Sequence, residues 1–109
     1  MGSLTDYAET ALLKHIGLEA AYTPAATLYL ALCTADPTDA ATGASMNEVA
    51  NSGSYARTAI AFSAAASRRS TQSGAVTFPA ATGSWGTVSN WAIVDSATYG
   101  AGKDRKSVV

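Results

Sequence analysis

The chain has 109 residues, a formal net charge of −1 and charged side chains at 14% of its positions. This length suits one domain, and the charge balance gives no electrostatic reason to expect binding to nucleic acid or to an acidic membrane surface. A single cysteine excludes an intramolecular disulfide and a cysteine-based metal cluster. No apolar run approaches the roughly 20 residues that span a bilayer, and no secretory signal is visible, so we expect a protein made and kept in the cytoplasm.

The first predicted element is a helix over Ser3–Gly17. Ser3 or Thr5 is the expected N-cap, because a hydroxyl oxygen accepts hydrogen bonds from the backbone of the first turn, and Gly17 is a suitable stop. Apolar side chains recur at every fourth position, which predicts one apolar face on this helix. That face consists of Leu4, Ala8, Leu12 and Ile16, with Tyr7 and Ala11 beside them.

Alternation of apolar with small or polar residues predicts strands after the helix. In Thr27–Cys33 the leucines all point to one side, so we expect this strand to have a buried leucine face. Two further clear strands are expected over 55–62 and 87–95, with a short strand over 75–78. The glycine-punctuated stretch between Ala40 and Gly53 is long for a loop, so we expect residues 46–49 to pair briefly at an edge.

One helix followed by short strands and long loops predicts a mainly β fold with one N-terminal α-helix, arranged as an antiparallel β-sandwich or jelly-roll-like domain. We expect residues 1–18 to form the amphipathic helix and residues 19–102 to form the sandwich. Residues 103–109 are expected to be a separate, non-native tail.

The reason for setting the tail apart is an abrupt change in composition. Three of the seven Lys and Arg residues lie in Lys103–Val109, and the last six residues are also what a common sequencing-adapter read encodes in one frame. We therefore expect the natural protein to continue with further strands that this chain lacks. The strand over 87–95 is then expected to leave an unpaired sheet edge.

The sequence offers no convincing set of catalytic or metal-binding residues. His15 is the only histidine and lies in the last predicted helical turn, and Cys33 alternates with leucines, where a buried bystander is the expected role. A nucleophile needs a positioned base, and a zinc site needs three or four ligands. Asp36–Asp39 is read as a turn, and Arg68–Arg69 is too small a basic patch for duplex binding. We expect no catalytic residue, no cofactor and no metal.

Two aromatic residues are the candidate partner contacts, Trp85 and Tyr99. Trp85 lies in a Gly-Ser loop, where a large aromatic side chain either folds back as a lid over the end of the sandwich or anchors a partner. Tyr99 lies in the predicted turn over Asp95–Gly100.

Several segments, in this order, resemble a family of small proteins from tailed-phage and prophage structural gene clusters, described as phage tail fibre-like or minor virion proteins. The resemblance covers about Ser3 to Gly102. It is carried by Ser3–Tyr7 with Leu12-Leu13, Pro24–Leu32 running into Ala35–Thr38, Gly53–Arg57, Ala75–Ala80, Gly83–Val88 and Ile93–Asp95.

The resemblance implies a non-enzymatic structural component of a tailed-phage virion, tail or tail-fibre associated. It implies other virion proteins as partners, a homo-oligomer in the particle, and passage through the host cytoplasm during assembly. It also implies a further apolar strand and a C-terminal strand pair beyond Gly100. Two alternatives stay open: a capsid decoration protein, and a receptor- or carbohydrate-binding β-sandwich module.

Overall fold

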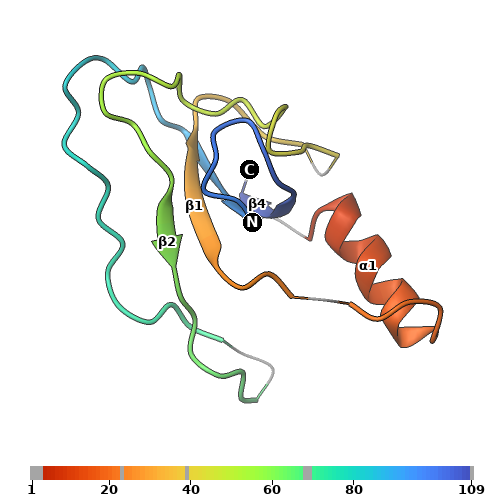
Figure 1. Cartoon of the computed structure of the whole chain (residues 1–109). Coiled ribbons are helices and arrows are strands. Elements are labelled where there is room, and N and C mark those ends of the chain that lie inside the picture. Colours follow the sequence, from red (N-terminus) through yellow and green to blue (C-terminus); the bar gives the residue numbers. More distant parts are fainter. Residues whose placement is uncertain (1–3, 23, 39, 68–69, 109) are drawn as a thin grey trace.

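The computed structural model describes residues 4–22, 24–38, 40–67 and 70–108. One helix, α1 (Asp6–Ile16), precedes four strands: β1 (Leu28–Cys33), β2 (Thr58–Ile60), β3 (Asn90–Val94) and β4 (Asp104–Val108). The strands form one antiparallel sheet in the order β2-β1-β3-β4, and α1 lies beyond the β4 edge (Figure 1). The predicted mainly β class with one N-terminal helix is confirmed. The described residues form a single sheet, so the sandwich and jelly-roll arrangement stays an expectation.

Helix α1 begins and ends where the sequence predicts. The Thr5 side chain caps it by accepting a hydrogen bond from the Ala8 N–H at 3.3 Å, and the Gly17 N–H donates to the Leu13 carbonyl at 2.9 Å. Ser3, the alternative cap, lies outside the described residues. With 11 residues, α1 is too short to cross a bilayer, and no other helix occurs in the part of the chain that the structure describes.

The predicted apolar face of α1 is mostly uncovered. Ala8 is buried, but Leu12 and Ile16 are 37% and 74% exposed. The physical reason is that α1 packs against one edge strand, β4, and not across the sheet, so only a narrow stripe of the helix is covered.

The predicted strands are present but shorter. The segment over 55–62 pairs with β1 only at Thr58–Ile60, and 87–95 pairs only at Asn90–Val94. The expected edge pairing over 46–49 is a single bridge between Cys33 and Glu48. The prediction of a strand over 75–78 is wrong: the structure leaves that segment outside the sheet, running beside β2.

The prediction of an unpaired edge beside the strand over 87–95 is also wrong. Residues of the expected tail form β4, which pairs with β3 at that edge. β4 pairs with β3 through Ala92 opposite Ser107, and with α1 through the Thr5 hydroxyl, which donates to the Asp104 carbonyl at 2.5 Å. Arg105 forms an ion pair with Asp95 at 2.9 Å. The edge is filled because hydrogen bonding to β3 satisfies backbone groups that would otherwise be exposed.

Candidate functional site

One face of the sheet is apolar and only partly covered. The register places the side chains of β1, β2 and β3 in cross-strand pairs on this face, with Leu28 opposite Ile60, Leu30 opposite Ile93 and Leu32 opposite Trp91. Phe62, just after β2, joins them around a groove of about 300 Å³. We call this surface the apolar sheet face, and it consists of Leu28, Leu30, Leu32, Ile60, Phe62, Trp91 and Ile93.

The buried face of β1 is the other one, which corrects the prediction of a buried leucine face. Ala31 and Cys33 are fully buried, together with Ala92 and Val94 of β3, beneath Met46. The leucines of β1 are only partly buried. Small side chains on a sheet allow a loop to approach closely, and the loop between β1 and β2 has therefore packed on the alanine and cysteine side.

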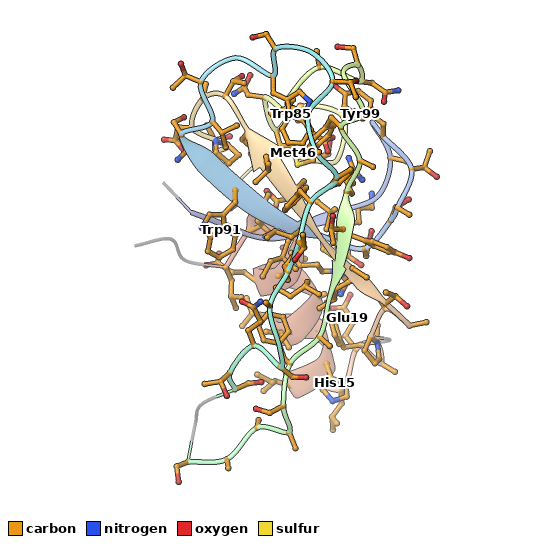
Figure 2. All side chains as sticks on the ribbon, turned by 90° about the vertical axis from the view of Figure 1, so that its left-hand side faces the viewer. His15, Glu19, Met46, Trp85, Trp91 and Tyr99 are labelled. Atoms are coloured by element: carbon orange, nitrogen blue, oxygen red, sulfur yellow. The ribbon has the colours of Figure 1, made fainter. Side chains whose placement is uncertain are left out.

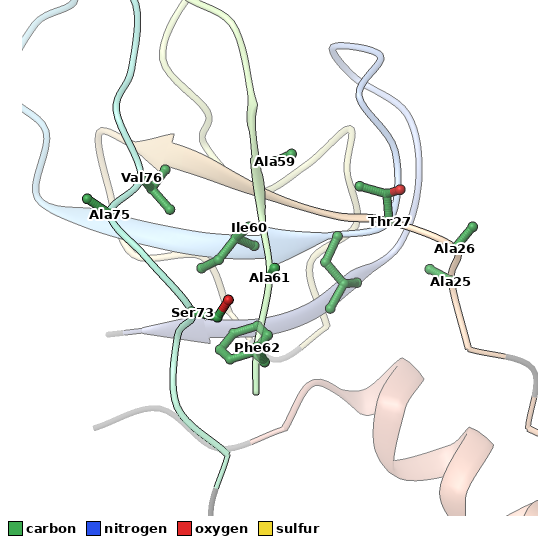
Figure 3. A pocket seen from close by; sticks show the side chains of 11 residues that line it. Ala25, Ala26, Thr27, Ala59, Ile60, Ala61, Phe62, Ser73, Ala75 and Val76 are labelled. Carbon is green, nitrogen blue, oxygen red and sulfur yellow. The ribbon is translucent and has the colours of Figure 1, made fainter. Parts of the chain in front are cut away.

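The apolar sheet face carries two large exposed side chains. Trp91 is 36% exposed and Phe62 is 41% exposed, whereas Ile93, two residues after Trp91 on β3, is buried. Figure 2 shows Trp91 on β3, well apart from Trp85 and Tyr99 at the end of the sheet. A second groove, of about 520 Å³, lies along β2 and shares Ile60 and Phe62 with the first (Figure 3). The residues that line these two grooves include no charged side chain.

A buried ion pair holds the covering loop against the opposite face. The Arg57 guanidinium donates to both carboxylate oxygens of Glu48, at 2.9 and 2.8 Å, and also to the carbonyls of Gly43, Ser96 and Ala101. Arginine presents five N–H donors, so all of them are used. The arrangement joins the β1–β2 loop to the β3–β4 loop at one point and fixes which face of the sheet is covered.

Tyr55 completes this network. Its hydroxyl donates to Glu48 at 2.5 Å and accepts from the Leu32 N–H at 3.1 Å. Burial, followed by the hydrogen bond to Glu48, raises the pKa of the Tyr55 hydroxyl above its ordinary range. Tyr55 therefore acts here as a neutral structural donor.

Trp85 and Tyr99, the predicted partner contacts, both pack on Tyr55. The Trp85 ring meets the Tyr55 ring edge-on at 5.4 Å between centroids, and its Nε1–H donates to the Gly53 carbonyl at 2.8 Å. Trp85 thus folds back onto its own chain. Tyr99 meets Tyr55 at 6.3 Å and remains 40% exposed. A contact between either residue and a partner stays a prediction.

The residues considered for chemistry are dispersed. Cys33 is buried, and burial, with smaller contributions from nearby Glu48 and Asp104, raises the pKa of its thiol to about 12. The His15 Nδ1 accepts a hydrogen bond from the Tyr22 N–H beyond the helix end. Among the described residues no three His, Cys, Asp or Glu side chains gather as a metal site. Asp39 and Arg68–Arg69 lie outside the described residues.

Sequence reasoning missed the Arg57–Glu48 pair. Both residues lie in segments of mainly small and polar residues, and no spacing relates them. The one available signal is an arginine on the same face of a predicted strand as Tyr55 and Ala59, because a buried arginine requires an acidic partner.

Comparison with known proteins finds one family. Residues 3–103 match the family model described as "Podophage GP4 fiber I protein gp80". No curated protein and no solved structure gives a significant match. A family model that matches nearly the whole chain agrees with the resemblance drawn from the sequence segments. The chain therefore belongs to the podophage GP4 fiber I protein gp80 family, a family of phage tail-fibre structural proteins.

Proposed function

We propose that this chain is a non-enzymatic subunit of the tail fibre and that copies of it associate through the apolar sheet face. Family membership gives the coarser part of this statement: a structural role in the fibre of a virion, in association with other virion proteins. The observation that supports the finer part is the uncharged, partly exposed apolar sheet face.

An open apolar face is unusual for an antiparallel sheet. Where one face of such a sheet meets water, its outward positions are normally polar, and contiguous apolar patches on a protein surface mark interaction sites. Here Leu30, Leu32 and Trp91 occupy outward positions. Trp91 is the expected anchor of the interface, because tryptophan is enriched among the side chains that dominate binding energy.

The occupant that fits this face is a second copy of the same chain. The residues that line the two grooves carry no charge. A charged partner surface would therefore lose its hydration there without meeting an opposite charge. An identical apolar face has no charge to desolvate, and a two-fold axis would place the same patch on both sides of the contact.

The test measures the mass of the chain in solution by light scattering after gel filtration, over a range of concentrations. We expect the wild type to form an oligomer and Trp91→Glu to remain a monomer with an unchanged circular dichroism spectrum. Leu13→Glu is the matched control, because Leu13 is an exposed apolar residue of α1, away from the sheet face. A monomeric wild type, or equal masses for the wild type and Trp91→Glu, would refute self-association through the apolar sheet face.

The lack of an enzymatic role is supported by the state of the nucleophile candidate. A thiol with a pKa of about 12 is protonated at neutral pH and is therefore a poor nucleophile. Its burial also keeps substrates away.

The two alternative roles are separated by experiments on particles. Cross-linking in purified virions is expected to join this chain to tail proteins, whereas a capsid decoration protein would be joined to head proteins. A glycan-binding module would lose binding with Trp85→Ala. Tyr99→Ala is the more direct test of a contact with another virion protein, because Tyr99 is the more exposed of the two rings.

A further inference from the structure

Two segments of the chain run side by side next to β2 and are joined at both ends. At one end the Ser63 N–H donates to the Thr71 carbonyl at 2.8 Å, and the Ser73 N–H donates to the Ala61 carbonyl at 2.9 Å. At the other end the Thr82 N–H donates to the Gly53 carbonyl at 3.0 Å. Residues 53–63 and 71–82 are thus already antiparallel, with Phe62 opposite Gln72.

The bonds at the first end define a register for the middle. In an antiparallel ladder hydrogen-bonded pairs recur every second residue, so the Ala61–Ser73 pair predicts Ala59–Ala75 as the next. The Ala59 backbone is free to take part, because β2 is the last strand of the sheet and its other neighbour is β1. In the part of the chain that the structure describes, no backbone hydrogen bond joins Ala59 to Ala75.

The β1 side of β2 agrees with this assignment. The Leu32 N–H and carbonyl both point toward the β2 side, where they bond the Tyr55 hydroxyl and the Val49 N–H. Alternation along β1 then directs Leu30 and Leu28 toward Thr58 and Ile60, their register partners. Ala59, between those two residues, directs its N–H and carbonyl outward to the free edge.

An open groove separates the two segments. Figure 3 shows Ala59, Ile60 and Phe62 on one side and Ser73, Ala75 and Val76 on the other. The groove has a volume of about 520 Å³, and the residues that line it carry no charge. The two segments can approach each other across this groove, because no charged side chain would be desolvated.

Gly74 follows the last hydrogen-bonded residue of this end, Ser73. Its φ is +91°, far from the extended value near −140° of an antiparallel strand. Glycine moves between these regions without a steric penalty. A Cβ placed on Gly74 would meet no atom within 4 Å, so only the backbone conformation distinguishes glycine from alanine at this position.

We infer that residues 74–78 close onto β2 as a fifth strand, with Ala59 opposite Ala75 and Gly74 as the hinge. Closure places Val76 opposite Thr58 and beside Ile60, which extends the apolar sheet face. It also satisfies the outward backbone groups of β2, the free edge that would otherwise pair with another chain. The inference rests on the register and the hinge, and does not depend on self-association through the sheet face.

The first test is disulfide formation between paired positions. Ala59→Cys/Ala75→Cys is expected to form an intramolecular disulfide under mild oxidation, because paired strand residues bring their Cα atoms to about 5.5 Å, within the range for a disulfide. Ala59→Cys/Val76→Cys is the matched control, because a shift of one residue points the two side chains to opposite faces. Native Cys33 is buried, and each single variant controls for its reaction. Equal rates for the two pairs, or no disulfide in a folded Ala59→Cys/Ala75→Cys protein, would overturn the inference.

The second test shifts the hinge. Gly74→Ala in the Ala59→Cys/Ala75→Cys background disfavours a positive φ and is expected to raise the rate of disulfide formation by about five-fold or more. Amide hydrogen exchange gives an independent measurement in the Gly74→Ala protein without added cysteines. We expect the Ala75 and Thr77 N–H groups to be protected and the Val76 N–H to exchange freely. An unchanged or slower disulfide rate, or no alternation in protection, contradicts closure in this register.

Discussion

Replacement of Arg57 by methionine tests whether the buried ion pair fixes the covered face. The Arg57 and Glu48 side chains are 1% and 4% exposed, and the guanidinium donates five hydrogen bonds, two to Glu48 and three to backbone carbonyls. Arg57→Met keeps the apolar stem but leaves the Glu48 carboxylate buried, with the Tyr55 hydroxyl as a remaining donor. Breaking a buried pair in this way typically costs about 3–5 kcal/mol.

That loss is large against the stability of a domain. Native domains unfold with a free energy of about 5–15 kcal/mol, so Arg57→Met is expected to remove roughly a fifth or more of it. Urea unfolding followed by tryptophan fluorescence measures the change, because Trp85 packs on Tyr55 beside the ion pair. The double variant Arg57→Met/Glu48→Met removes both charges and is expected to be less destabilised than the sum of the single variants by about 1–3 kcal/mol.

The exposed pair of Lys14 and Glu19 is the matched control. Its atoms are 3.8 Å apart and its side chains are 48% and 69% exposed, so Lys14→Met is expected to change the free energy of unfolding by less than ~0.5 kcal/mol. The reasoning fails if Arg57→Met costs less than ~1 kcal/mol, or if the double variant is additive within ~0.5 kcal/mol.

Three further outcomes follow from single contacts. The pKa of Cys33 is raised from 9.0 to about 12 in the folded state, so its contribution to stability is complete below pH 9 and is lost as the pH rises toward 12. Over this range the free energy of unfolding is therefore expected to fall less steeply with pH for Cys33→Ala than for the wild type. Thr5→Ala removes both the helix cap and the bond to Asp104 and is expected to cost about 1–2 kcal/mol in urea unfolding, whereas Thr5→Ser keeps the hydroxyl and most of the stability. Gly43→Ala would place its Cβ 1.9 Å from a backbone carbonyl oxygen of the loop after β3 and is expected to lower the melting temperature strongly; Gly83→Ala, with ordinary contacts, is the control, and similar melting temperatures for the two variants would contradict the close approach.

The strands were predictable, but the covered face of the sheet was not. Alternation located β1 and β3 because each has a period of two. Both faces of β1 are apolar, however, with leucines on one and alanine and cysteine on the other. Hydrophobicity favours burying the leucines, whereas the structure buries Ala31 and Cys33. The choice is made by the loop between β1 and β2, and the Arg57–Glu48 pair that holds this loop has no local sequence pattern.

The residues of the apolar sheet face could be predicted from the sequence only as faces of separate strands. The leucines of β1, Ile60 with Phe62, and Trp91 with Ile93 each formed one side of a predicted strand. Their union depends on which strands are neighbours and in what register, and that information comes from pairing between residues far apart in the chain. The segment 75–78 has strand composition but lies outside the sheet, since a positive φ at Gly74 interrupts the extended backbone.

The Thr5–Asp104 contact has a consequence for the order of folding. These residues are 99 positions apart, and α1 packs against β4 alone among the described strands. An 11-residue helix is marginal in water by itself, so α1 gains support only when the last strand of the sheet is in place. The first element to leave the ribosome is therefore the last to be stabilised. Non-local contacts of this kind slow folding, and they leave Ala8, the buried residue of α1, uncovered while the sheet assembles.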